Sequence, residues 1–356
     1  MDDTKIGATR LDPAQSRVLT GLLILASCYT LSAARDYFLP IFLALIAYFI
    51  LSPLVRLLHR RLRLPPALGG AAVLLLLIGV TVFGFSRLAD PASEWMAKAP
   101  RSLRTLERKL GQLRKPVQQV SQAAEEVENL ARMDRGNSVQ EVEIKAKSLG
   151  GTLVIGTQRL VVGTAVVVVL LYFFLVYGDR FLLELVRLTP LGRHRQAELV
   201  LSETEHQVSI YLATVTLINL ALGGAVAVAL YFLQVPNPVL WGVLAAVLNF
   251  VPYFGALVGV VIVGLMSALT FDTLAVAAVP PAVYFGLTSL EGSFITPMFL
   301  GRRFSLNPVV IVLWLLLWGW MWGIAGALLA TPLLTVLRIL CDHVESMAPL
   351  SELLDR

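Results

Sequence analysis

The sequence predicts an all-α integral membrane protein, a polytopic helical bundle of about eight hydrophobic segments. The chain is 57% hydrophobic and 15% charged, whereas soluble domains average about 45–50% apolar and about 25% charged residues. Its apolar residues form continuous runs of about 20 residues or more, which is the length a helix needs to cross the hydrocarbon core. Barrel strands would alternate apolar and polar residues, so helices are expected.

Five of these runs have the length of a single crossing. They cover residues 18–34, 37–55, 65–86, 160–178 and 208–233. Arginine and lysine residues beside them predict which ends face the cytoplasm, because short cytoplasmic loops are enriched in these residues. These residues are Lys5, Arg10 and Arg17 before the first run, Arg56, Arg60, Arg61 and Arg63 after the second, and Arg180, Arg187, Arg193 and Arg195 after the fourth. The pattern predicts a cytoplasmic N-terminus. The chain starts with acids before its first base and the first run has no small-residue cleavage site, which predicts an uncleaved first span.

Residues 88–151 mix acidic and basic residues and are expected to form a charged segment outside the cytoplasm. Within it, apolar residues recur at alternating steps of three and four, as in a heptad repeat that Pro116 interrupts. They are Leu103, Leu106, Leu110, Leu113, Val117, Val120, Ala124 and Val127. Two interpretations stay open: a helix that packs against neighbouring subunits, or an amphipathic helix on its own membrane domain or on the lipid surface.

The last two apolar regions, 237–270 and 307–340, are too long for one crossing each. Each has about 34 residues, or about 50 Å as a straight helix, against a hydrocarbon core of about 30 Å. Both open with Asn-Pro-Val and both carry Gly-Ala-Leu in the middle, beside helix-breaking residues. The residues are Asn237, Pro252 and Gly255 in the first region and Asn307, Gly319, Gly323 and Gly326 in the second. This match predicts an internal repeat of about 70 residues, each copy being one span and one broken hairpin.

The placement of Arg302 and Arg303 indicates an inverted topology for the two copies. If the first hairpin enters and leaves the membrane from outside, the span 275–300 runs inward and places both arginines in the cytoplasm. The second hairpin then enters from inside, and the C-terminus is cytoplasmic. Transporters built from such inverted repeats place their substrate near the midplane. The alternative is that Pro252 and Gly255 only kink a helix, since Pro and Gly are common in membrane helices.

These segments divide the chain into six predicted parts. They are three N-terminal transmembrane helices (1–87), the charged segment (88–151), the fourth transmembrane helix with a cytoplasmic loop (152–207), the first repeat (208–270), the second repeat (271–342) and a cytoplasmic tail (343–356).

Glu291 is the candidate residue for coupling transport to an ion gradient. It lies inside the apolar span 275–300, where an ionisable group is costly unless it faces a cavity or a partner. We expect its carboxylate to bind a proton or a cation. The alternative is a structural acid that hydrogen-bonds a helix end or pairs with Arg302 or Arg303.

The other candidate pathway residues lie at or near the predicted breaks. They are Asn249, Pro252, Tyr253, Gly255, Thr296, Pro297, Asn307, Gly323 and Gly326. Oxygens of the polar members can bind a hydroxylated solute or a dehydrated cation, although each alone is more often a helix cap or an interhelical hydrogen bond. Asn219 is a weaker candidate of the same kind. Trp314, Trp318, Trp320 and Trp322 are expected mainly to pack or to anchor helices at the membrane interface.

No motif in the sequence indicates an enzyme, a cofactor or a bound metal. There is no P-loop, and the four histidines lack metal-ligand spacing. Cys28 and Cys341 fall inside apolar helix patterns and are expected to be small buried residues. The basic clusters lie beside spans and not on a soluble face, which argues against nucleic-acid binding.

The second half of the chain contains three longer motifs: LNFVPYFGALVG, LEGSFITPMFLGRRFSLNP and WGWMWGIAGALLATPLLTVLRIL. They resemble the signature stretches of the bacterial AI-2E family of transporters, named for an exporter of the signal autoinducer-2. The resemblance implies an inner-membrane transporter and a homo-oligomer, in a family with members described as sodium or lithium/proton antiporters. The matching residues are Asn249, Pro252, Tyr253, Gly255, Glu291, Pro297, Gly301, Trp322, Gly323, Gly326 and Pro332. Ala256 and Met298 differ from the commoner family pattern, and Met298 removes a positive charge that many members carry.

Two functions of different classes stay open. The first is a secondary transporter or exporter of small polar solutes, with cation/proton antiport as its nearest variant. Its partners would be the lipid bilayer, the solute and a proton or sodium ion. The second is a non-transporting membrane scaffold whose outer segment assembles partners. The breaks and Glu291 favour the first, because a scaffold gains nothing from polar breaks in the middle of the membrane.

Overall fold

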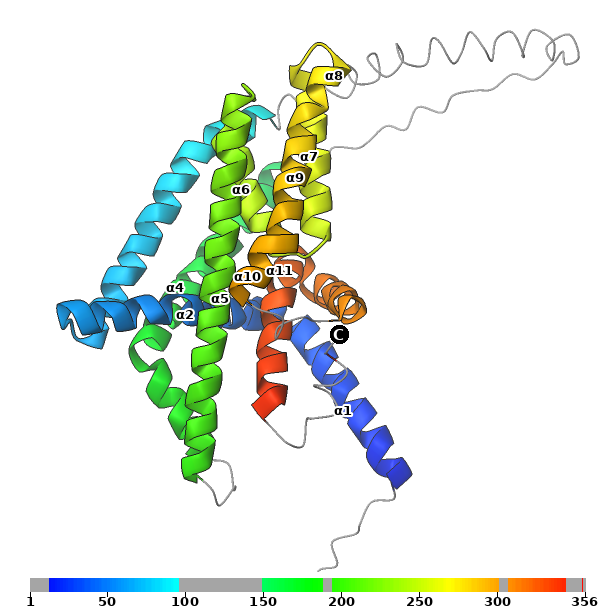
Figure 1. Ribbon diagram of the computed structural model, residues 1–356. Coiled ribbons are helices and arrows are strands. Elements are labelled where there is room, and N and C mark those ends of the chain that lie inside the picture. Colours follow the sequence, from blue (N-terminus) through cyan, green and yellow to red (C-terminus); the bar gives the residue numbers. More distant parts are fainter. Residues whose placement is uncertain (1–12, 96–148, 188–193, 301–306, 344–353, 355–356) are drawn as a thin grey trace, which may run out of the picture. The chain divides into compact units, whose positions relative to one another are not determined.

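The computed structural model describes residues 13–95, 149–187, 194–300, 307–343 and 354. Every regular element within these ranges is a helix (Figure 1). The helices are α1 (Pro13–Ala33), α2 (Arg35–Leu62), the helix Pro66–Trp95, α4 (Leu149–Arg187), α5 (His194–Phe232), α6 (Pro238–Leu248), α7 (Phe254–Thr270), α8 (Leu274–Ala277), α9 (Val279–Leu290), the π-helical turn η2 (Glu291–Ile295), α10 (Thr296–Leu300) and α11 (Pro308–His343). The predicted heptad segment, Gly301, Arg302 and Arg303 lie outside the described residues.

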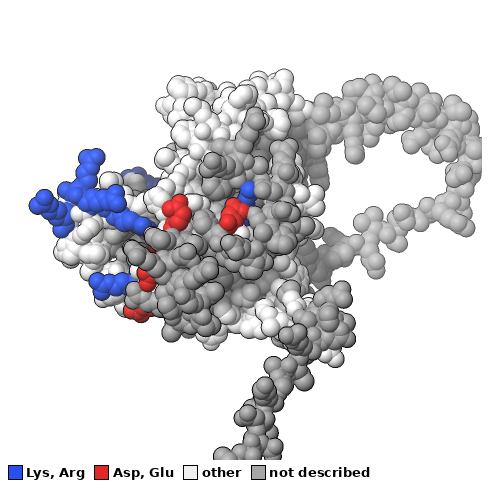
Figure 2. All heavy atoms as spheres, turned by 60° about the horizontal axis from the view of Figure 1, so that its bottom comes forward, with Lys and Arg blue, Asp and Glu red and all other residues white. Residues whose placement is uncertain are grey.

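Six helices in the described ranges are long and apolar enough to cross a membrane. They are Arg35–Leu62, Pro66–Trp95, Val161–Gly178, Leu201–Phe232, Leu274–Leu300 and Pro308–Asp342. Val18–Ala33, α6 and α7 are also apolar but shorter. On the face that Figure 2 shows, charged side chains of the described residues occupy only a few places. The fold therefore agrees with the helical membrane protein that the composition predicts.

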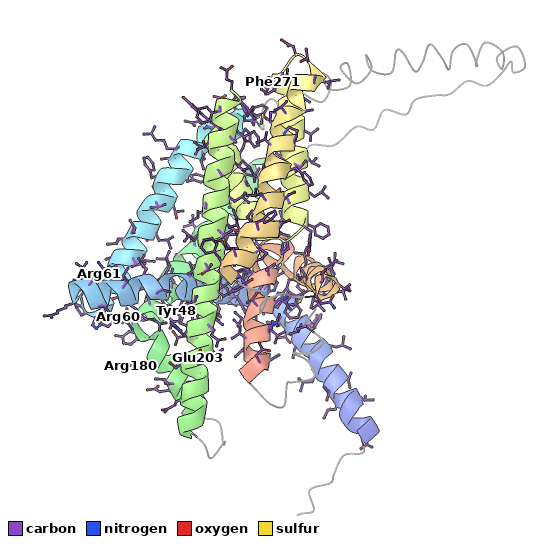
Figure 3. The ribbon with its side chains drawn as sticks, in the orientation of Figure 1. Tyr48, Arg60, Arg61, Arg180, Glu203 and Phe271 are labelled. Carbon is purple, nitrogen blue, oxygen red and sulfur yellow. The ribbon has the colours of Figure 1, made fainter. Side chains whose placement is uncertain are left out.

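The charged residues of α2 lie at its C-terminal end. Arg60 and Arg61 belong to its last turn and are labelled there in Figure 3. Positive side chains at this end of a helix interact favourably with the helix dipole. The same two arginines are among those that indicate a cytoplasmic loop after α2.

The described helices contribute to two compact units. Unit 1 comprises Met1–Pro53, Gly163–Leu212 and Ser305–Arg356, and unit 2 comprises Leu54–Val162 and Ala213–Phe304. In unit 2, α7 packs against both α6 and α9. One core cluster of unit 2 contains Leu222 and Val226 of α5 together with Trp241, Val263 and Tyr284 of α6, α7 and α9. In unit 1, α1 packs against α11, and Leu334 and Cys341 of α11 form a cluster with Leu354.

The region 237–270 is interrupted between α6 and α7. Tyr253, at the break, has φ 63° and ψ −54°, and the Phe254 N–H donates to the Pro252 carbonyl at 2.7 Å. These angles and this hydrogen bond define a γ-turn of the rare, strained form. Pro252 has no N–H with which to continue the helical hydrogen-bond ladder. The break thus lies at the proline that the sequence indicates, and the strained residue is its neighbour.

The region 307–340 is interrupted within α11 at Gly323. This residue has φ 66° and ψ −143°, a conformation that glycine adopts without the clash of a Cβ atom. Tyr253 and Gly323 each follow the opening asparagine of their region by sixteen residues. The two regions therefore share the position of the positive φ angle as well as their sequence motifs.

A second feature shared by the two breaks is a glycine pressed against a backbone carbonyl. A Cβ atom on Gly255 would lie 1.8 Å from the Leu248 carbonyl oxygen, and one on Gly326 would lie 2.0 Å from the Trp318 carbonyl oxygen. Both distances are far below van der Waals contact. These are the glycines of the two Gly-Ala-Leu motifs, so each motif permits the close approach of chain segments across its break.

We expect Gly255→Ala to destabilise the protein, because the new methyl group would overlap the Leu248 carbonyl. Overpacking costs about 1–3 kcal/mol, and the obstacle here is backbone that cannot turn aside. Thermal unfolding of the purified protein in detergent measures the effect. Gly224→Ala is the matched control, because a Cβ there meets nothing within 4 Å. Equal melting temperatures for the two variants would contradict the close approach.

Candidate functional site

Glu291 lies in a helix whose turns widen at that residue. The chain from Val279 to Leu300 runs through α9, η2 and α10, and the Thr296 N–H donates to the Glu291 carbonyl, five residues earlier. A π turn of this kind is rare and is often found at functional sites. Pro297 follows directly, and its ring and missing N–H disfavour an ordinary α turn at this place. The local sequence therefore explains why the helix widens around Glu291.

Three polar side chains are linked by hydrogen bonds to the Glu291 carboxylate, two directly and one through Asn249. Asn249 Nδ2 donates to Glu291 Oε2 at 3.3 Å and to Asn219 Oδ1 at 2.8 Å. Thr296 Oγ1 donates to Glu291 Oε1. Glu291 is only 7% exposed and Asn219 only 2%. We call Asn219, Asn249, Glu291 and Thr296 the Glu291 cluster; all four belong to unit 2.

The close packing of α5 and α6 allows Asn219 to reach Asn249. A Cβ atom on Gly223 would lie 2.6 Å from the Gly242 carbonyl oxygen, and one on Gly242 would lie 2.5 Å from the Gly223 carbonyl oxygen. Small residues at such a crossing let the backbones of membrane helices approach closely. Gly223 is one helical turn beyond Asn219, so this crossing holds Asn219 beside the C-terminal end of α6.

Asn249 caps the end of α6, at the first residue of the break. Its backbone N–H still donates to the Ala245 carbonyl, as in a continuing helix. Its side-chain Nδ2 supplies two of the three hydrogen bonds of the cluster, which leaves its Oδ1 available as an acceptor. The break therefore places the amide oxygen of the half-buried Asn249 close to the buried Glu291 carboxylate.

The Glu291 cluster can bind a proton, a cation or a hydroxyl group. Carboxylate, amide and hydroxyl oxygens are the ligands that hard cations prefer. Asn219 Nδ2 is buried without a hydrogen-bond partner among the described residues, and leaving a buried donor unpaired costs about 1–3 kcal/mol. A hydroxyl group could pair with it and also donate to an acceptor of the cluster. The chemistry thus fits a polar solute as well as an ion.

The other candidate residues of unit 2 are Pro252, Tyr253, Gly255 and Pro297, and the structure describes no hydrogen bond from any of them to Glu291. Gly255 is buried against Leu248, whereas the Tyr253 side chain is 61% exposed. Pro252 and Pro297 act through the backbone, by ending a helix and by widening one. The two prolines thus shape the backbone on either side of the cluster.

Asn307, Gly323 and Gly326 belong to unit 1. Asn307 caps α11, since its Oδ1 accepts the Val309 N–H at 3.0 Å, and its own N–H donates to the Leu354 carbonyl at 3.1 Å. This is the helix-cap alternative that the sequence left open for Asn307. Gly323 and Gly326 belong to the interruption of α11. Gly323 adopts the positive φ angle there, and Gly326 permits the close approach to the Trp318 carbonyl.

Unit 1 also holds a buried acid that the sequence does not single out. Glu205 is 8% exposed, and its Oε1 accepts a hydrogen bond from Tyr48 Oη at 2.8 Å. One turn further along both helices, the Ser52 and Ser209 hydroxyls lie 3.1 Å apart. Figure 3 labels Tyr48 on α2. Hydropathy predicts an apolar run that starts at residue 208 and so assigns Glu205 to the adjoining loop.

One known protein family matches the chain over most of its length. Residues 19–346 match the family described as AI-2E family transporter. The chain belongs to this family. The AI-2E family resemblance of the three motifs thus extends over nearly the whole sequence, including all four residues of the Glu291 cluster.

Relatives in the AI-2E family carry names that refer to transport. The chain is 29% identical to "Putative transport protein YhhT" of Escherichia coli K12 over 90% of this chain and 89% of that one. It is 31% identical to "AI-2 transport protein TqsA" of the same organism, over 38% and 39% of the two chains. It is 28% identical to "Putative transport protein MT0215" of Mycobacterium tuberculosis over 87% and 85%. A multi-pass membrane transporter is the function class that family and fold support together.

We expect the Asn219 and Asn249 side chains to be energetically coupled. Asn219→Leu and Asn249→Leu should each destabilise the protein by about 1–3 kcal/mol. Asn219→Leu removes a buried acceptor of Asn249 Nδ2, and Asn249→Leu leaves the buried Asn219 Oδ1 without its donor. The double variant should cost less than the sum, with a coupling of about 0.5–3 kcal/mol. Chemical unfolding in detergent measures the cycle. Ser267→Ala is the control, because it removes a buried hydroxyl that has no partner in the described part of the chain. Its change in unfolding free energy should add to that of Asn249→Leu without a coupling energy. A coupling energy between Ser267 and Asn249 but none between the two asparagines would contradict the assignment.

Proposed function

We propose that this AI-2E family member is a secondary transporter that exports small polar solutes and is coupled to an ion gradient through Glu291. The observation that carries the proposal is a carboxylate buried inside a membrane-spanning helix, hydrogen-bonded to the residue at which a neighbouring helix breaks. Ionisable residues at such positions mark substrate pathways and proton relays. We place the protein in the bacterial inner membrane as a homo-oligomer, as the family implies.

The proposed architecture has eight hydrophobic segments, two of them re-entrant hairpins in inverted repeats. The first hairpin is α6–α7, and the second is α11 with its interruption at Gly323. Irregular backbone at membrane depth is tolerated where it is buried in protein or lines a polar cavity. In this arrangement Asn249 and Glu291 lie on two elements that can shift against each other as the solute passes, and the bound ion sets the direction of transport.

The inverted topology predicts the side of the membrane on which two loops are labelled. Asp272→Cys, in the loop after α7, should react with an impermeant thiol reagent added outside intact cells. Ser305→Cys, which lies outside the described residues, should react only with a permeant reagent. The assay is run with Cys28 and Cys341 replaced by serine. If region 237–270 is instead a full crossing, the two labelling patterns exchange.

A sodium or lithium/proton antiporter is the second candidate of the same class. The Glu291 cluster favours it, because one carboxylate that binds either a proton or a metal cation is sufficient for exchange. The scaffold alternative would rest on residues 88–151, of which 96–148 lie outside the described ranges. Loss of function on deleting residues 101–147, with variants of the breaks unaffected, would favour the scaffold.

Vesicle transport tests the coupling directly. In everted vesicles carrying a preformed pH gradient, sodium or lithium should dissipate the gradient with the wild-type protein and fail to do so with Glu291→Gln. Glu203→Gln is the matched control, because Glu203 is exposed on α5 and accepts a hydrogen bond from Gln207 one turn later. A response in the wild type that Glu291→Gln retains would refute coupling through Glu291. No response in the wild type would exclude the antiporter and leave solute export.

A further inference from the structure

Three buried hydrogen-bond donors in α11 have no partner among the residues that the structure describes. They are Trp314 Nε1, Trp318 Nε1 and Thr331 Oγ1. In two other tryptophans the indole N–H has an acceptor. Trp241 Nε1 donates to the Pro236 carbonyl and Trp322 Nε1 to the Leu31 carbonyl, each at 3.0 Å. Buried indole N–H groups usually find an acceptor. Three unpaired donors on one element are therefore a feature that packing alone does not explain.

The interruption at Gly323 brings the three donors to one region of unit 1. Trp314 and Trp318 precede the interruption, with ring centroids 5.8 Å apart, and Thr331 follows it. The part of α11 after Gly323 lies against the part before it, because Gly326 approaches the Trp318 carbonyl and Trp314 packs against the cluster that contains Leu334. Thr331 precedes Leu334 by one helical turn and so shares its face. Figure 1 shows the change of direction within α11.

The chemical character of this donor group differs from that of the Glu291 cluster. An indole N–H can only donate a hydrogen bond. Two of the three groups therefore cannot bind a cation or a ligand group that is itself only a hydrogen-bond donor. Lipid hydrocarbon supplies no acceptor. A buried positive charge, Arg338, lies on the same part of α11 as Thr331 and is 5% exposed; its Nε is 3.9 Å from Asp342.

We propose that the folded α11 binds the carbonyl or carboxylate oxygen of a small ligand, with Trp314 Nε1, Trp318 Nε1 and Thr331 Oγ1 as the donors. In this proposal two or three of the donors converge on one point, an arrangement that suits the lone pairs of an sp² oxygen. The aromatic rings beside them form the apolar wall: Phe42 packs against Trp318 and Trp322, with centroids 6.1 Å and 5.3 Å apart. This site shares no residue with the Glu291 cluster and does not depend on ion coupling.

Nitrogen-15 NMR of the indole groups tests the proposal on the full-length protein in detergent micelles. The chain has six tryptophans, and single Trp→Phe variants assign their N–H resonances. Acetate and acetone are the probes. The Trp314 and Trp318 resonances should shift with one or both, in a saturable way, while Trp241 and Trp322 stay in place because their N–H groups are already bonded. Acetate alone acting identifies a carboxylate site, and acetone acting as well identifies a carbonyl site.

Two variants each remove one donor: Thr331→Val keeps the side-chain volume, and Trp318→Phe keeps a smaller aromatic ring. Trp318→Phe and Thr331→Val should each weaken binding of the active probe, read at Trp314, about five- to tenfold per lost hydrogen bond. Thr331→Ser keeps the hydroxyl and should bind as the wild type does. The proposal is overturned if neither probe shifts Trp314 and Trp318 more than the exposed Trp320, which is the result expected of donors that only meet water. It is also overturned if ethylammonium, which offers donors alone, shifts them equally.

Discussion

The burial of a carboxylate within a membrane-spanning helix is the constraint on which unit 2 depends. Glu291 can remain there because Asn249 and Thr296 donate hydrogen bonds to its two oxygens, and each donor needs a departure from regular helix. The π turn places Thr296 within hydrogen-bond distance of Glu291, and Asn249 is the C-terminal cap of α6. The close crossing at Gly223 and Gly242 then supplies Asn219 to hold the Asn249 amide in place. Local irregularity is thus what makes the buried charge tolerable.

The two interruptions reach similar backbone geometry by different means. At the first, Tyr253 takes a positive φ angle at a cost in strain of about 1–3 kcal/mol; at the second, Gly323 takes one without it. Each lies in its own unit and carries its own polar groups. The Glu291 cluster near the first offers carboxylate and amide oxygens together with the unpaired Asn219 Nδ2, and the unpaired donors Trp314 Nε1, Trp318 Nε1 and Thr331 Oγ1 lie along α11.

The sequence was informative where one residue type has a direct effect on the backbone or on solvation. Composition predicted the helical membrane class, and Pro252 with Gly255 predicted the first break, since a missing N–H and a missing Cβ act locally. Partners distant in sequence could not be identified in this way: nothing in the spacing pairs Asn219 with Asn249. Glu205 was overlooked because hydropathy marks where apolar residues begin and not where the buried helix begins.

The unpaired donors of α11 show a second limit of the same kind. Tryptophans in membrane helices are usually packing residues or interfacial anchors, and that interpretation describes how the rings of Trp318 and Trp322 contact Phe42. Whether an indole N–H finds an acceptor depends on which carbonyl lies opposite after the chain has turned at Gly323. Ring packing follows from residue type, whereas hydrogen bonding follows from the fold.

The π turn at Glu291–Ile295 has a consequence for how sequences of this family are compared. Such a turn is equivalent to one extra residue inserted into an α-helix, and each added residue rotates the rest of the helix by about 100° around its axis. A homologue that lacks the insertion would carry the threonine equivalent to Thr296 on another face, even if every neighbouring residue were identical. A single-position alignment gap here would therefore indicate that the carboxylate has lost its hydrogen bond from the threonine, and would not be a neutral change in length.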